Sequence, residues 1–251
     1  MRTRFFAGVL AGAVLLASAP GYAQDVQSIL SKVTAAYRSA KSYQAQVSIT
    51  ETRQMGGQQQ KQSTTLTTKY KAPNKMVTIV QGRESMQVYS DGKTMYIYLP
   101  KEKQYMKAPA PASLAQQGGV GAAGAGDPSQ IGAQLQTMFA TGAKKLADQT
   151  VGGKPMFVLQ SSRSGQSQDG KISFKMTATA FIDKASYLLR QLTLSSVQSQ
   201  GTQNLTQTIT ISFASQQINP NLPDSVFVFK PPAGAKEQQM PASPSGPPAP
   251  R

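Results

Sequence analysis

The chain contains no cysteine, no histidine and no tryptophan. Without cysteine it can form no disulfide and offers no thiolate nucleophile, and no cysteine follows the leader to accept a lipid. Without histidine it lacks the usual general base at neutral pH, and the two absences together remove almost every zinc site. We therefore expect a protein that is not an enzyme, has no cofactor or metal, and depends on burial for its stability.

The eleven carboxylates do not suggest a catalytic pair either. Asp91, Asp169 and Asp183 stand at turns, where aspartate serves the backbone. Gly152-Gly153-Lys154 lacks the spacing of a phosphate-binding loop and is typical of a hairpin turn. Hydrolysis of an envelope substrate by these carboxylates stays open as an alternative function, and replacing each of them by alanine would test it.

The first residues have the pattern of a secretory signal. Arg2 and Arg4 precede an uncharged apolar run from Phe5 to Ala17, and small residues lead up to Ala23. We expect cleavage after Ala23, so that residues 1–23 are a signal peptide. The apolar run is shorter than the roughly 20 residues of a membrane-spanning helix. These features predict an exported, soluble protein in the bacterial periplasm.

The charge balance is strongly basic. The chain has 26 lysines and arginines against 11 acids, and removal of Arg2 and Arg4 leaves 24 against 11, a net charge of +13. The basic residues are scattered along strands without a nucleic-acid-binding motif, so we expect no nucleic-acid partner. Two interpretations remain: a solvated surface, or transient docking to anionic membrane surfaces or membrane proteins.

Periodicity predicts one helix followed by strands. Apolar residues at helical spacing from Val26 to Ala40 indicate an amphipathic helix, with Asp25 near its positive end. From Tyr43 the period changes to two, and turn signals, among them Asp91-Gly92, separate short segments as in an antiparallel meander. In the segment after this turn, Met95, Ile97 and Leu99 share one face.

Composition shifts between Ala108 and Pro128, where proline, glycine and alanine predict a flexible loop. Residues 129–140 follow as a short helix with Ser129 as its cap. Its apolar stripe consists of Ile131, Leu135, Met138 and Phe139. This helix is either a lid over a cavity or a part of the core.

Strands resume at Lys154 and continue to a last short piece at residues 225–232. Ile172, Phe174 and Met176 share one face of a strand, and in a later strand Ile209 and Ile211 alternate with threonines, which is typical of a sheet wrapped around a core. We expect the folded domain to span residues 24–230 and the Pro-rich residues 231–251 to be disordered.

Three landmarks in order resemble the LolA-like superfamily of periplasmic lipoprotein carriers and sensors. They cover most of the chain from Asp25 to Lys236 and are Lys71-Ala72-Pro73-Asn74, the hairpin Ser90 to Tyr98, and Phe227, Phe229, Pro231, Pro232 and Gly234. The resemblance implies an α+β fold, mainly antiparallel β: an unclosed, curved half-barrel whose concave face is covered by helices. It also implies a cavity for acyl chains and a lid helix. The family's arginine before the proline, which ties the lid closed, is Ala72 here, so the operation of the lid stays open.

The predicted lining of that cavity is apolar and rich in methionine, which adapts to flexible ligands but also fills cores. It consists of Met76, Met86, Val88, Met95, Ile97, Leu99, Phe174, Met176, Leu192, Ile209 and Ile211. A register error of one residue would exchange the two faces of a strand. Our leading hypothesis is a monomeric carrier or binding protein for lipid or acylated lipoprotein, of the outer-membrane lipoprotein-sorting type. The alternative is an envelope sensor or protein-interaction module that uses the same half-barrel.

Overall fold

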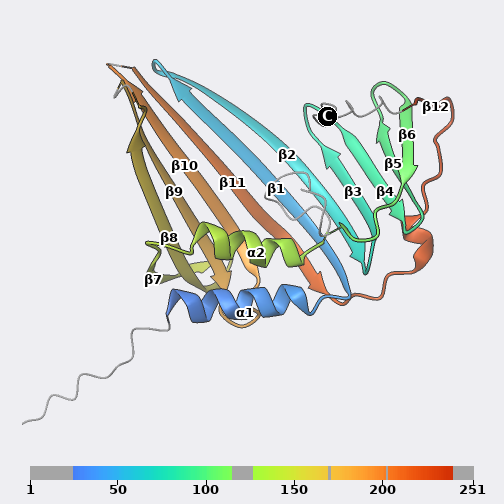
Figure 1. Cartoon of the computed structure of the whole chain (residues 1–251), viewed down its shortest axis with the longest axis horizontal. Helices are drawn as coiled ribbons and strands as arrows, with labels where there is room; N and C mark the ends of the chain where they lie inside the picture. The colour runs from blue at the N-terminus through green and yellow to red at the C-terminus, as the bar shows by residue number, and fades with distance from the viewer. Residues whose placement is uncertain (1–24, 115–126, 169–170, 202, 240–251) are drawn as a thin grey trace, which may run out of the picture.

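In the described part of the chain, twelve strands form a single open sheet, which one pair of helices crosses (Figure 1). The computed structural model describes residues 25–114, 127–168, 171–201 and 203–239; the predicted signal peptide lies outside them. Along the sheet the strand order is β12-β6-β5-β4-β3-β2-β1-β11-β10-β9-β8-β7, and every neighbouring pair is antiparallel except β12 and β6. The predicted fold class, an unclosed, curved, mainly antiparallel sheet with helices on one face, is confirmed.

The strands fall into two groups by length. The first half of the chain forms β1 (Ser42–Met55), β2 (Gln58–Lys71), β3 (Lys75–Gln81), β4 (Met86–Asp91), β5 (Thr94–Leu99) and β6 (Gln104–Pro109). The second half forms β7 (Lys144–Val151), β8 (Lys154–Gln166), β9 (Ile172–Asp183), β10 (Leu189–Gln200), β11 (Gln203–Ile218) and β12 (Lys236–Glu237). The long strands β1, β2 and β8 to β11 lie side by side and reach well beyond the helices (Figure 1).

Both helices lie on the same face of the sheet, called here the inner face (Figure 1). Helix α1 (Val26–Arg38) agrees with the prediction, and the Asp25 side chain accepts a hydrogen bond from the Gln27 backbone N–H at its start. Helix α2 (Ser129–Met138) begins differently from the prediction. Ser129 does not cap it; instead Asp127 Oδ1 accepts from the Ser129 N–H at 2.9 Å.

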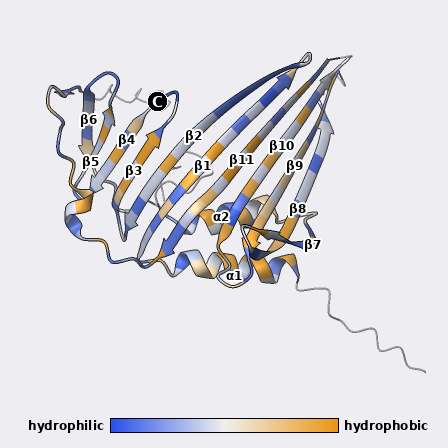
Figure 2. Ribbon diagram, turned by 180° about the vertical axis from the view of Figure 1, so that it is seen from behind, coloured by the Kyte–Doolittle hydropathy of each residue, from blue (hydrophilic) through white to orange (hydrophobic). Residues whose placement is uncertain are grey.

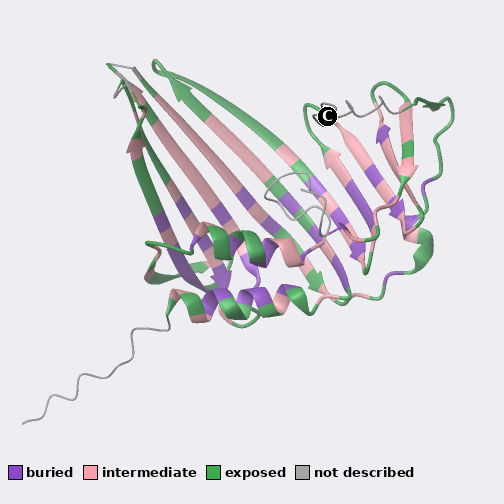
Figure 3. Ribbon diagram, in the orientation of Figure 1, coloured by how far each residue is buried: buried purple, intermediate pink, exposed green. Residues whose placement is uncertain are grey.

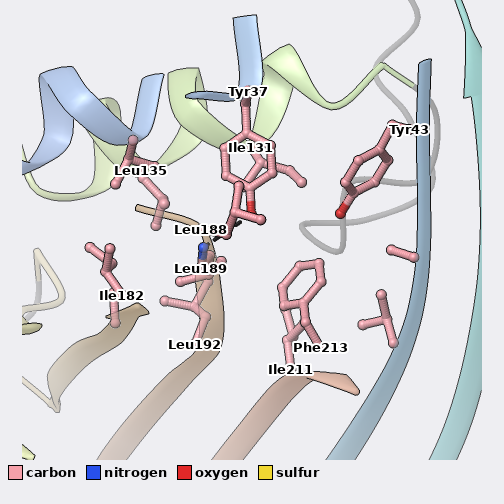
Figure 4. Close-up of a cluster of buried hydrophobic side chains, with 14 of the residues drawn as sticks. Tyr37, Tyr43, Ile131, Leu135, Ile182, Leu188, Leu189, Leu192, Ile211 and Phe213 are labelled. Carbon is pink, nitrogen blue, oxygen red and sulfur yellow. Dashed lines mark hydrogen bonds between the residues drawn. The ribbon is translucent and has the colours of Figure 1, made fainter. Parts of the chain in front are cut away.

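The core between the helices and the sheet is tied together by buried polar groups (Figure 4). The hydroxyls of Tyr37 and Tyr43 both donate to Gln216 Oε1, at 2.7 and 2.9 Å, and the Tyr37 hydroxyl accepts from the Leu189 N–H at 3.1 Å. Burial raises the pKa of both phenols above the ordinary value. These hydrogen bonds attach α1 to β1, β10 and β11 at one place.

The C-terminal segment differs from its prediction as a strand. Residues Asp224–Phe227 form a 3-10 helix, η2, that packs on the outer face of β3 and β4, with Phe227 fully buried. Phe229 then lies among four tyrosine rings of β4, β5 and β6, with centroid distances of 5.1–5.8 Å. Because an apolar segment covers this part of the outer face, both faces of β3 to β5 can be apolar.

Three further boundaries differ from the predictions. The sequence predicts that strands resume only at Lys154, whereas the structure already has β7 at Lys144–Val151. The fold continues past Lys230, because β12 pairs with β6. Of the predicted disordered tail, residues 240–251 lie outside the described part. In the loop predicted at 108–128, β6 extends to Pro109 and Leu114 is buried in the core, while residues 115–126 lie outside the described part.

Candidate binding groove

The inner face of the sheet has a covered end and an uncovered end. Near the helices the strand residues are buried, and toward the opposite end of the long strands they become half-buried and exposed (Figure 3). On β9, Ala180 and Ile182 are completely buried, whereas Met176 is 55% exposed and Phe174 is 38% exposed. The inner face of β9, which contributes to the core near the helices, therefore stays apolar beyond the edge of α2.

A groove of about 860 Å³ lies between α2 and the strands β8 to β11. From α2 it is lined by Gln130, Ala133, Gln134, Thr137 and Met138. From the sheet it is lined by Ser161, Arg163, Met176, Thr177, Ala178, Leu194, Ser195, Ser196, Gln207 and Ile209. The volume is in the range of sites that hold one small molecule. Nine of the fifteen lining residues are polar, and the six apolar ones are Ala133, Met138, Met176, Ala178, Leu194 and Ile209.

The structure brings three of the predicted site residues together in this groove, namely Met138, Met176 and Ile209. Leu192 and Ile211 lie on the same face but closer to the helices, where they are buried in the core. Phe174 lies beyond the groove on β9, and its ring occupies the space over Gly165, since a Cβ built there would lie 2.6 Å from the ring. Whether these residues contact a ligand stays a prediction.

The other predicted lining residues lie on β3, β4 and β5, outside the groove. Met76 and Val88 are buried in the core, and Met86, Met95 and Ile97 pack against it while half-buried. Leu99 is half-buried, and its place in the strand puts it on the same face as Ile97. These side chains share the inner face with the groove but lie across β1 and β2 from it.

The predicted lid residues divide between two environments. Ile131, Leu135 and Phe139 are at most 2% exposed and belong to the core, whereas Met138 lines the groove. Helix α2 also packs closely on α1, because a Cβ built on Gly132 would lie 2.8 Å from Thr34 Cα. Three of the four side chains of the predicted apolar stripe thus lie in the core, as expected for a helix that completes the core. Ala72 is exposed, and its N–H donates to Lys41 O at 2.8 Å.

Sequence reasoning missed several residues that line the groove. Leu194 pairs with Ala178 between β10 and β9, and Arg163 pairs with Met176 in the separate pairing of β8 with β9. Leu194 has the same parity as the predicted Leu192, so alternation alone could have found it. Arg163 could not be found in this way, because placing it in the groove requires the pairing of β8 with β9.

The charges near the groove are unevenly paired. Glu51 lies on β1 opposite Ile209 and accepts hydrogen bonds from Arg53 Nε at 2.5 Å and from Gln207 Nε2 at 2.8 Å. Arg163, which lines the groove and is exposed, has no hydrogen bond or ion pair among the described residues. The groove therefore offers one free cation next to apolar side chains.

Other kinds of site find no support in the described part of the chain. No group of three or more Asp or Glu there could hold a metal ion. No helix among residues 25–114, 127–168, 171–201 and 203–239 is long and apolar enough to cross a membrane.

One family model matches the first part of the chain. Residues 26–117 match the family described as "Predicted periplasmic protein (DUF2092)". This description confirms the predicted periplasmic location. No curated protein sequence matches the chain.

Several solved structures are similar to the chain. LprF from Mycobacterium bovis is 15% identical, with 78% of this chain and 95% of that chain covered and a TM-score of 0.38. A LolA superfamily protein from Nitrosomonas europaea is 12% identical, with coverages of 81% and 97% and a TM-score of 0.34. MucB, in a complex with MucA from Pseudomonas aeruginosa, is 13% identical, with coverages of 81% and 60% and a TM-score of 0.40. The likeness to LolA-like proteins noted in the sequence is thus found again among structures.

Proposed function

We propose that this protein is a periplasmic binding or carrier protein for lipid or acylated lipoprotein, which shelters an acyl chain in the groove between α2 and β8 to β11. It acts by binding and not by catalysis. The observation that carries the proposal is the groove itself, together with the apolar side chains of β9 that stay uncovered beside it. Large apolar groups exposed in a row on one strand face are a mark of a binding surface.

The energetics of such a site favour a hydrocarbon. Each methylene group that moves from water into an apolar site contributes about 0.8 kcal/mol. Met138 and Met176 stand on opposite walls of the groove, and unbranched thioether side chains adjust their shape to a flexible chain. A ligand would therefore gain stabilisation along its whole chain without a rigid match of shape.

The experiment that tests the proposal is the titration of a fluorescent acyl-chain probe into the purified protein. We expect saturable binding that Met176→Gln weakens severalfold, because it places an amide in the apolar wall. The matched control is Lys175→Gln, which alters the neighbouring residue on the opposite face of β9. Absence of binding to the wild-type protein, or equal loss in both variants, would contradict the proposal.

Several finer parts of the hypothesis belong to the same proposal. The carrier acts as a monomer in outer-membrane lipoprotein sorting, α2 and the residue that follows it act as the lid, and the basic surface docks transiently to membranes or membrane proteins. Because Ile131, Leu135 and Phe139 are buried in the core, outward movement of the lid would expose them to water. Release of the ligand would have to uncover them or proceed along the open end of the groove.

The second candidate function, an envelope sensor or protein-interaction module, is favoured by another part of the inner face. Toward the ends of β1 and β2 this face carries Glu51, Arg53 and the exposed glutamines Gln58, Gln60 and Gln62. Polar side chains of this kind suit a protein partner better than a hydrocarbon. Crosslinking in cells that yields one protein partner, from a protein that binds no acyl probe, would favour this candidate.

A further inference from the structure

The wall of the groove carries charge of a single sign. Of the fifteen described residues that line it, Arg163 is the only arginine, and no lysine, aspartate or glutamate is among them. Glu51 contacts the lining through Gln207, and its charge is already paired with Arg53. A ligand in the groove would therefore meet one positive charge and no competing negative charge.

The guanidinium of Arg163 is also unengaged. Within the described residues it forms no hydrogen bond and no ion pair, whereas Arg53 pairs with Glu51 and Arg190 pairs with Asp183. A guanidinium presents several N–H donors in a planar fork that matches the oxygens of a carboxylate or a phosphate. Such a group in a binding site is suited to an anion.

The position of Arg163 along the groove agrees with an amphiphile. Arg163 pairs in register with Met176, and the next pair on this face, toward the helices, is Ser161 with Ala178. Ser161 and Ala178 are buried, while Arg163 and Met176 are exposed. The cation thus stands at the open end, and the apolar wall of Ala178, Leu194 and Met138 continues from it toward α2.

We infer that the groove selects amphiphiles with an anionic headgroup, whose carboxylate or phosphate pairs with Arg163 while the acyl chain lies along Met176, Leu194 and Met138. This inference rests on the proposed function and specifies the class of ligand. At about 860 Å³ the groove suits the acyl part of one lipid molecule.

The test compares headgroups on one chain length by isothermal titration calorimetry, below the micellar concentration of each anion and below the solubility limit of the alcohol. The ligands are dodecanoate, dodecyl phosphate and the neutral dodecanol. We expect the wild-type protein to bind at least one of the two anions about tenfold or more tightly than the alcohol, as a charge-assisted hydrogen bond would provide. Binding of dodecanoate or of dodecyl phosphate alone would support the inference and identify which source of anion the site accepts.

Arg163→Gln is the decisive variant, and Lys175→Gln is its control. Both remove one positive charge from an exposed position, but Lys175 lies on the outer face. We expect Arg163→Gln to lose most of the preference for the anion over dodecanol, and Lys175→Gln to keep the preference of the wild type. Circular dichroism and thermal unfolding would show that both variants remain folded.

The failures are distinguishable. Equal affinity of the wild type for anionic and neutral ligands, or the same loss in both variants, would overturn the inference and leave the proposed function standing. If no ligand binds with any headgroup, the proposed function fails, and the inference fails with it.

Discussion

The long strands of this sheet have two ends that differ in what covers them, and β2 and β9 respond to that difference in opposite ways. At the covered end, Leu66 and Tyr70 of β2 and Ala180 of β9 are buried in the core. At the uncovered end the inner face of β2 becomes polar, with three glutamines at alternate positions, and the blue colour of this end of β2 is visible in Figure 2. The inner face of β9 stays apolar as far as Ile172.

This contrast supports the placement of the proposed binding surface on β9. Exposed apolar side chains in a row cost solubility, and a strand that needs none can carry glutamine, as β2 does. On β9 the exposed row of Ile172, Phe174 and Met176 leads directly into the groove. The apolar residues of the covered end thus stabilise the fold, and those of the uncovered end of β9 are free to bind.

Truncation of one large apolar side chain at each end of the long strands should have very different effects on stability. Phe139→Ala should destabilise the protein by about 3–5 kcal/mol, because this ring is fully buried and its removal leaves a cavity. Met176→Ala should change the free energy of unfolding by less than about 0.5 kcal/mol, because the side chain is more than half exposed. Urea denaturation measures both. Comparable losses would mean that the uncovered end supports the fold as much as the covered end does.

The contact between the two helices offers a second test of the covered end. Gly132→Ala should cost about 1–3 kcal/mol, since the new methyl group would lie 2.8 Å from Thr34 Cα and the helices would have to move apart. Gln134→Ala, at an exposed position on the side of α2 that lines the groove, is the control and should have little effect. A Gly132→Ala protein as stable as the wild type would show that α2 shifts freely on α1, as a loosely held lid would.

The hydrogen bonds of Tyr37 and Tyr43 beneath α1 should contribute to the free energy of unfolding by about as much as the helix contact does. Tyr37→Phe removes the hydroxyl that accepts from the Leu189 N–H and leaves this buried donor unpaired, which should cost about 1–3 kcal/mol. Tyr43→Phe should cost less, because Gln216 keeps its bond from Tyr37. Urea denaturation of the two variants checks the order, and the reverse order would contradict this account of the cluster.

The smallest expected effect is that of pH between about 5 and 9, where the absence of histidine leaves few groups to titrate. Hydrogen bonds from Lys71 and Lys75 lower the pKa of Asp224 to about 2. A lowered pKa contributes stability that is complete above the unfolded value, about 3.9, and is lost as pH falls. Burial raises the pKa of Tyr37 and Tyr43, so their contribution is complete below about pH 10 and is lost above it.

Urea midpoints measured across pH check this profile. They should form a plateau with an acid limb below about pH 4 and an alkaline limb above about pH 10. A step in stability between pH 5 and pH 8 would show that a carboxylate or an amine with a strongly shifted pKa had been overlooked.

The architecture could be predicted from the sequence because its signals are local. Alternation placed Met95 and Ile97 on one face of a strand, and the structure packs both against the core. Helical spacing found α1, and glycine pairs at positive φ mark the hairpins at Gly56-Gly57 and Gly152-Gly153. Each of these inferences needs only neighbours in the sequence.

The extent of the groove could not be predicted, because it depends on how far the helices reach along the strands. Met176 and Ala180 share a strand face, and only the position of α2 makes one exposed and the other buried. In the same way, the β-branched and aromatic residues of the segment 225–232 favour a strand, whereas Asp224–Phe227 forms η2 and Phe227 packs on Val77 of β3. Contacts between distant segments decide these features.

The proposed function places an acyl chain in the groove between α2 and β8 to β11. Photocrosslinking with a fatty acid that carries a diazirine near its methyl end, followed by peptide mass spectrometry, would locate that chain. We expect adducts on peptides that contain Met138, Met176 or Leu194, and their loss when unlabelled fatty acid competes. Adducts confined to the outer face or to the polar ends of β1 and β2, or no adducts at all, would contradict it.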